Sequence, residues 1–105
     1  MSAKHQILAT RSSLHRAASI LRVLSHPARL QILQFIRENE QTVTAIQKHA
    51  QLTQAMTSQH LKIMFESGLI QKRRQGTSIF YVATKDIGVT ILNTVEGCKE
   101  LWYDK

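Results

Sequence analysis

The chain has 105 residues, 43% of them hydrophobic, which suits one domain with a modest core and leaves no room for a second domain. Its 14 Lys and Arg outnumber its 7 Asp and Glu, giving a formal net charge of +7. A single cysteine excludes a scaffold held by intramolecular disulfides.

The basic residues precede an acidic tail. Residues 1–37 carry six Lys or Arg and no acid, residues 41–85 carry six with Glu66 as the sole acid, and residues 86–105 carry four acids and two Lys. A basic body fits a polyanionic partner such as nucleic acid, although a small soluble protein can have the same balance without one.

The N-terminal segment is too polar for a signal peptide, and no apolar run approaches the roughly 20 residues of a membrane span. We therefore expect a cytoplasmic protein with no membrane partner.

The first predicted helix covers about residues 5–24, where apolar side chains recur at helical spacing. They are Ile7, Leu14, Ala18 and Leu21, with Ala17, Ile20 and Leu24 beside them. A second helix begins at Pro27, because proline is accepted in a first turn, and His26 is its expected cap. Its predicted buried stripe is Leu30, Leu33 and Ile36. A short third helix fits residues 43–50, with Thr42 as its cap and Ile46 pointing inward.

Thr53 is a good N-cap for a fourth helix, which should run to about Ser67 and stop at Gly68, the residue best able to adopt a left-handed conformation. About three residues link it to the third helix, as in a helix-turn-helix. The helical period predicts an inward face of Thr57, Leu61 and Met64, joined by Phe65. It predicts an outward face of Gln54, Ser58, Gln59 and Lys62.

This outward face is polar but weakly charged, which favours base reading. Gln can pair bidentately with adenine, Ser can serve donor or acceptor edges in the major groove, and Lys62 can meet a phosphate. The alternative is a solvated face without a partner, since amides are common on protein surfaces.

A hairpin with a basic tip follows the fourth helix. Leu69 and Ile70 open a strand, Gln75 and Gly76 form a polar turn, and the β-rich run 79–82 returns. The tip residues are Lys72, Arg73 and Arg74 before the turn, with Thr77 and Ser78 after it. Such a tip can neutralise phosphates or enter a minor groove. The order of elements predicts a mainly α winged helix-turn-helix of about five helices that binds double-stranded DNA.

The last predicted helix covers about residues 85–103 and has one apolar face. That face is formed by Ile87, Ile91, Val95, Cys98 and Trp102. With Ile7 and Leu14 of the first helix it exceeds what three short core helices can cover, so we expect residues Ile7, Leu14, Ile91, Val95, Cys98 and Trp102 to form a homodimer interface. A two-fold dimer places two recognition helices about one DNA turn apart and predicts an inverted-repeat operator. The alternative is a single intramolecular bundle.

Two segments together resemble a known family. "LRVLSHPARLQILQFI" and "LTQAMTSQHLKIMFESGLIQKRRQGTSIFYV" resemble the arsenical-resistance repressor (ArsR/SmtB) family of bacterial transcription factors over about residues 15–85. The resemblance implies a homodimeric repressor, built on its first and last helices, that leaves its operator when an effector binds. It also implies base contacts at or near Gln54, Ser58, Gln59 and His60, and a wing carrying Arg73 and Arg74.

The chain departs from this family at its usual metal sites. Where many members carry an "E-L-C-x-C-D-L" box this sequence reads "EQTVTAI", so Thr42 and Thr44 replace the cysteines, and a hydroxyl cannot replace a thiolate for a soft metal. The other common site lacks its histidines, because Gly88 follows Asp86 at the Asp-x-His position and no His lies beyond His60. We therefore expect no metal and no cofactor, and the effector stays unknown.

The remaining candidate groups give weak signals. The five histidines are scattered and show no ligand spacing, with His5 and His15 on the first helix the least implausible ligands across a dimer. Cys98 lies on an apolar stripe, where a lone cysteine usually packs as a small hydrophobe, but an intersubunit disulfide would make a redox switch. No catalytic motif is present, so an enzyme is not expected. The competing non-enzymatic reading is a protein-interaction module without specific DNA binding.

The sequence thus predicts a DNA-binding transcriptional regulator, most simply a dimeric repressor. Its predicted DNA-contacting residues are Thr53, Gln54, Ser58, Gln59, His60, Lys62, Arg73, Arg74 and Thr77.

Overall fold

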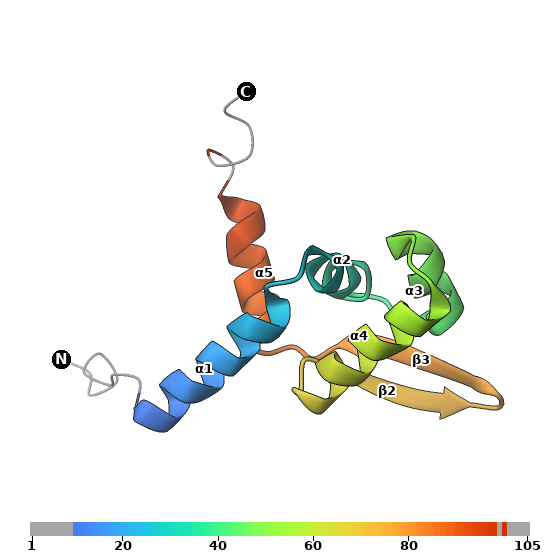
Figure 1. The fold of residues 1–105 in the computed structure, drawn as a ribbon, viewed down its shortest axis with the longest axis horizontal. Helices are drawn as coiled ribbons and strands as arrows, with labels where there is room; N and C mark the ends of the chain where they lie inside the picture. Colours follow the sequence, from blue (N-terminus) through green and yellow to red (C-terminus); the bar gives the residue numbers. More distant parts are fainter. Residues whose placement is uncertain (1–9, 99, 101–105) are drawn as a thin grey trace.

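The computed structural model describes residues 10–98 and 100, and within them it contains five α-helices and a three-stranded antiparallel sheet (Figure 1). The elements are α1 (Arg11–Leu24), α2 (Pro27–Phe35), β1 (Gln41–Thr42), α3 (Val43–Ala50), α4 (Gln54–Glu66), β2 (Ile70–Gln75), β3 (Ser78–Ala83) and α5 (Ile87–Gly97). This order confirms the predicted mainly α winged helix-turn-helix.

The core lies where α2, α3 and α4 meet the hairpin. Its fully buried side chains come from each of these elements and include Ile32, Leu33, Ile36, Ile46, Leu61 and Met64. Burying an aliphatic side chain of this size contributes about 1.5–3 kcal/mol. Leu33, Ile36 and Ile46 were predicted inward, whereas Leu30 is only half-buried.

Threonine caps begin three of the helices. The hydroxyl oxygens of Thr42 and Thr53 accept hydrogen bonds from the backbone N–H groups of Ala45 (3.2 Å) and Met56 (3.1 Å), which confirms both predicted caps. Thr10 caps α1 in the same way, so within the described residues the helix begins at Arg11; residues 5–9 of its predicted range lie outside them. His26 occupies the cap position of α2, but its side chain makes no capping hydrogen bond.

The chain leaves α4 by a left-handed residue, as predicted, because Gly68 has φ +79°. The hairpin then pairs Ile70 with Ala83 and Gln75 with Ser78, so its two-residue turn is Gly76-Thr77, one residue later than expected. Gly76 has φ +63°, the conformation that such a turn requires. The third strand, β1, was missed because it has only two residues, which pair with Phe80 and Tyr81 of β3.

Helices α1 and α5 project away from the compact body formed by the other elements (Figure 1). Ile20 and Leu24 anchor the C-terminal end of α1 in the core, while Leu14 and Leu21 are 57% and 52% exposed. The C-terminal half of α5 is tied to the segment just after α2, where Arg37 donates to Glu96 (2.6 Å) and to Asn93 (2.9 Å). No helix in the described part of the chain is long and apolar enough to cross a membrane.

Candidate nucleic-acid interface

The outward face of α4 is exposed over its whole length. Thr57, Leu61 and Met64 are buried, as the helical period predicts, and they turn the opposite side to solvent. The residues Gln54, Ala55, Ser58, Gln59 and Lys62 are all exposed. The predicted polar face is therefore free of intramolecular cover. Phe65, predicted inward, is 40% exposed because it lies beside the hairpin rather than in the core.

His60 does not share that outward face. It is half-buried, and its Nδ1 accepts a hydrogen bond from Nε of Arg29 on α2 (3.0 Å). Arg29 is itself buried and donates through Nη1 to the carbonyl oxygen of Val23 on α1 (3.1 Å). Burial lowers the pKa of His60, and the nearby charges of Arg29 and His26 lower it further. Arg29 thus links α1, α2 and α4, and His60 faces this contact instead of pointing to solvent.

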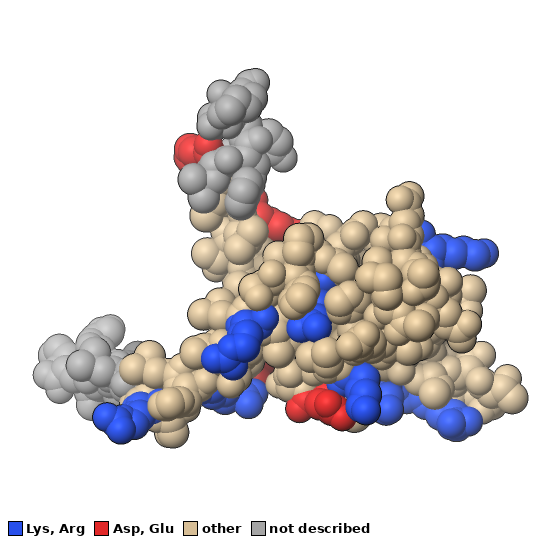
Figure 2. Space-filling view, viewed as in Figure 1, with Lys and Arg blue, Asp and Glu red and all other residues tan. Residues whose placement is uncertain are grey.

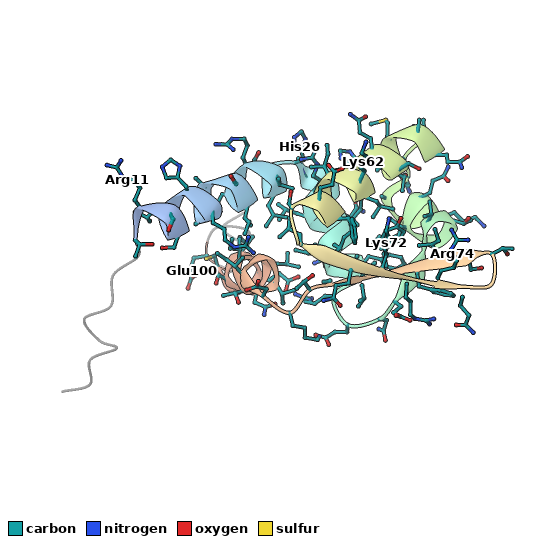
Figure 3. The ribbon with its side chains drawn as sticks, turned by 90° about the horizontal axis from the view of Figure 1, so that it is seen from below. Arg11, His26, Lys62, Lys72, Arg74 and Glu100 are labelled. Atoms are coloured by element: carbon teal, nitrogen blue, oxygen red, sulfur yellow. The ribbon has the colours of Figure 1, made fainter. Side chains whose placement is uncertain are left out.

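The cations of the hairpin are divided between its two faces. Lys72 lies over the ring of Phe65 of α4, with Nζ 4.4 Å from the ring centroid, so its face of the strand is the one beside α4. Because side chains alternate along a strand, Arg74 shares that face and Arg73 does not. Figure 3 shows Lys62 on α4 and then Lys72 and Arg74 along β2 toward the turn.

Arg73 is occupied by an acid of its own chain. Its guanidinium donates to both carboxylate oxygens of Glu40, at 2.7 to 3.0 Å, and stacks over Phe80, its cross-strand partner. The hydrogen bonds from Arg73 lower the pKa of Glu40. Arg73, expected to be free for DNA, therefore forms an ion pair with Glu40 on the face of the hairpin away from α4.

A groove separates α4 from the hairpin on the other face. It is lined by Ser58, Lys62, Phe65, Lys72 and Tyr81, among others. Polar and cationic groups from α4 and β2 thus border one hollow, together with the carboxylate of Glu66 at the end of α4. Figure 2 shows further Lys and Arg side chains along the edge of the molecule that contains the hairpin and the free end of α1.

Two residues outside the predicted DNA-contacting set lie on this surface, and one of them, Lys72, was predicted only as a cation of the hairpin tip. Strand alternation alone does not say which face of the hairpin Lys72 occupies; its contact with Phe65 shows that it is the face beside α4. Ala55 lies one helical turn before Gln59, and sequence reasoning that looked for hydrogen-bonding side chains passed over it. Thr53 acts as the cap of α4, and Thr77 occupies the turn.

The predicted dimer residues differ in their surroundings. Leu14 is exposed, whereas Ile91 packs against the protein's own core, so part of the apolar stripe of α5 is used within the chain.

The other predicted dimer residues lie toward the end of α5 or outside the described residues. Val95 lines a groove between α5 and α2, and the thiol of Cys98 donates to the carbonyl oxygen of Thr94 (3.2 Å). Ile7 and Trp102 lie outside the described residues.

The position that carries a ligand histidine in many metal-sensing relatives of the resembled family is crowded by the side chain of Leu69, which would have to shift to admit a larger residue. Gly88 packs so tightly that a Cβ there would lie 2.5 Å from Cδ2 of Leu69. Among residues 10–98 and 100, no three His, Cys, Asp or Glu side chains are grouped so that they could hold a metal ion.

Residues 26–72, which span α2 to the middle of β2, match the model of the family described as bacterial regulatory protein, arsR family. The biofilm growth-associated repressor of Xylella fastidiosa is 31% identical over 81 residues, 77% of this chain and 71% of that protein. NolR from Sinorhizobium fredii has a similar structure, with a TM-score of 0.77, 26% identity and coverage of 97% of this chain and 94% of NolR.

A third similar structure has the same fold. It is the homodimeric winged helix-turn-helix DNA-binding domain of a possible ArsR-family regulator from Mycobacterium bovis, with a TM-score of 0.78, 24% identity and 94% of each chain covered. The exposed face of α4, the adjoining cationic hairpin and these relatives all indicate a DNA-binding protein. The chain belongs to the arsR family of bacterial regulatory proteins and is a DNA-binding transcriptional regulator, not an enzyme.

Proposed function

We propose that the protein is a homodimeric repressor that binds an inverted-repeat operator and is released by an effector. In this proposal Gln54, Ser58 and Gln59 of α4 read base edges in the major groove, and Lys62, Lys72 and Arg74 hold phosphates. Arg73 contributes less than the expected wing arginine, because a phosphate must first displace Glu40. The protein acts in the cytoplasm, where its DNA lies.

The observation that carries this proposal is the continuity of two surfaces. The exposed face of α4 is polar and uncharged in its first two turns and carries Lys62 and Glu66 further along, and it meets the cationic face of β2 across a single groove. Duplex DNA presents the complementary arrangement, since base edges lie between two phosphate backbones. A protein-interaction module has no need of this pairing of amides with flanking cations.

Dimerisation is supported by exposed apolar side chains and by a similar structure. Leu14 and Leu21 are more than half exposed, unlike Ile20 and Leu24, which anchor α1 in the core. The Mycobacterium bovis domain of the same fold is described as homodimeric. Repression is supported by the function named for the Xylella fastidiosa relative.

The test separates base reading from phosphate binding. DNA fragments selected by the purified protein from a random pool supply an operator, and anisotropy titrations then compare that operator with scrambled DNA. We expect Gln59→Ala to lower the operator-to-scrambled affinity ratio by roughly ten- to a hundredfold, the effect of a lost bidentate base contact. Lys72→Ala should weaken both complexes alike.

Two outcomes contradict the proposal. If selection enriches no sequence and the parent binds operator and scrambled DNA equally, the protein is not a sequence-specific regulator of this kind. If Gln59→Ala keeps the full affinity ratio, α4 is not the reading helix.

A further inference from the structure

The first turn of α4 exposes apolar groups. Ala55 is exposed and Met56 is 46% exposed, although the next residue, Thr57, is completely buried. Successive residues of a helix are about 100° apart, so Met56 lies at one edge of the outward face and Ala55 near its centre. A recognition helix contacts base edges chiefly through its N-terminal residues. These apolar groups therefore lie where base contacts are expected.

The protein's own core does not use these side chains. The buried side of α4 is completed by Thr57, Leu61 and Met64. Single exposed apolar residues are common on protein surfaces and need no special account. Ala55 and Met56 differ because they are adjacent and because Ala55 lies one turn before Gln59, the proposed adenine reader.

The major groove offers one apolar group, the C5-methyl of thymine, and small or flexible apolar side chains are its partners. An A·T pair presents adenine to an amide and, on the same edge, the thymine methyl to an apolar side chain. Methionine suits this contact, since its unbranched thioether adapts to the shape it meets. Guanine is read chiefly by Arg or Lys; α4 has no Arg, and its one Lys, Lys62, lies about two turns after Ala55, away from the first turn.

We propose that Met56, with Ala55, packs on thymine methyl groups and so selects A·T pairs beneath the first turn of α4. The inference rests on the proposed function, since it specifies the bases that the proposed reading helix prefers.

Removal of single methyl groups from the DNA provides the test. In the selected operator each thymine is replaced in turn by deoxyuridine, which keeps every hydrogen-bonding group and lacks only the methyl. For the parent protein we expect at least one position per half-site at which this change weakens binding about fourfold, the factor for one buried methyl-sized group. Thymines outside the half-sites serve as the DNA control and should show no effect.

Protein variants then locate the contact. Met56→Ala should bind the thymine operator more weakly and should lose most of the thymine-to-uracil difference. Ser58→Ala, an exposed neighbour on the same helix, should weaken both operators equally and keep the difference. Met56 is exposed, so its truncation leaves the core intact.

The outcomes distinguish this inference from the proposed function. If the parent prefers its operator but no deoxyuridine position changes binding, the methyl contact is refuted while the regulator stands. If Met56→Ala keeps the full difference, the assignment to Met56 is wrong. If no sequence is preferred at all, the proposed function itself fails.

Discussion

Arg29 and His60 form the contact that fixes the recognition helix to the rest of the body. The guanidinium is buried, and its two hydrogen bonds join α1, α2 and α4 at one point. The bond to Nδ1 requires a neutral imidazole, because a protonated ring has no free lone pair at that nitrogen. The position of α4 therefore depends on the charge state of one histidine.

This dependence predicts a loss of stability in acid. Folding lowers the pKa of His60 below its ordinary value of 6.5, chiefly by burial and then through Arg29 and His26. The unfolded chain consequently binds more protons in the window below pH 6.5, so stability falls as the pH drops through that window and levels off below the folded pKa. Thermal unfolding measured between pH 7.5 and 5 should show the decline.

Two asparagine variants identify the group responsible. In His60→Asn an amide oxygen replaces Nδ1 as the acceptor and cannot titrate, so its stability should change less with pH. His49→Asn removes an exposed histidine that stacks on Phe35 and should keep the parent's decline. Identical pH profiles for the parent and His60→Asn would refute the role of His60.

At the scale of elements, the hairpin combines a cationic face and an internally paired face. Each phosphate contact contributes about 0.9 to the slope of log affinity against log salt concentration. Lys72→Ala and Arg74→Ala should therefore each flatten that slope by about 0.9 per protomer, and Arg73→Ala by clearly less. If Arg73→Ala flattens it as much as Arg74→Ala, the ion pair with Glu40 does not restrain the arginine.

Removing the internal acid should have the opposite effect. Glu40→Gln frees the Arg73 guanidinium for DNA, so we expect tighter binding at low salt and a steeper slope. Glu38→Gln is the matched control, because it removes the same charge from an exposed pair with Lys85. Equal slopes for the two glutamine variants would show that only net charge matters.

Most elements could be predicted because their signals are local. Thr42 and Thr53 act on backbone groups three residues away, and Gly68 ends α4 through its own conformation. The faces of the hairpin could not be predicted, because Arg73 and Glu40 are 33 residues apart and their contact depends on how the sheet pairs. For the same reason the sequence placed Phe65 in the core, although the tertiary structure sets it beneath Lys72.

At the scale of the whole molecule, a monomer offers the DNA only one reading helix. The interface of a single small winged helix covers one half-site, whereas a two-fold dimer covers two half-sites about 34–36 Å apart. We expect helix α1 to help join two copies, because, like α5, it projects from the body, and its Leu14 and Leu21 are exposed (Figure 1).

Charged substitutions on α1 test this assembly. Leu14→Glu combined with Leu21→Glu places two carboxylates in the proposed apolar interface, where an unpaired buried charge costs several kcal/mol. We expect the variant to sediment as a monomer at micromolar concentration and the parent to sediment as a dimer. Because both side chains are exposed, its far-UV circular dichroism should match that of the parent.

The DNA response of this monomer follows from the geometry. It should retain weak, salt-dependent binding through its own α4 and hairpin, yet lose the dependence of affinity on half-site spacing. Inserting five base pairs between the half-sites rotates one of them by about half a turn, so the insertion should weaken binding of the parent and leave the variant unaffected. A parent protein that tolerates the insertion would show that two copies do not bind the operator as one rigid unit.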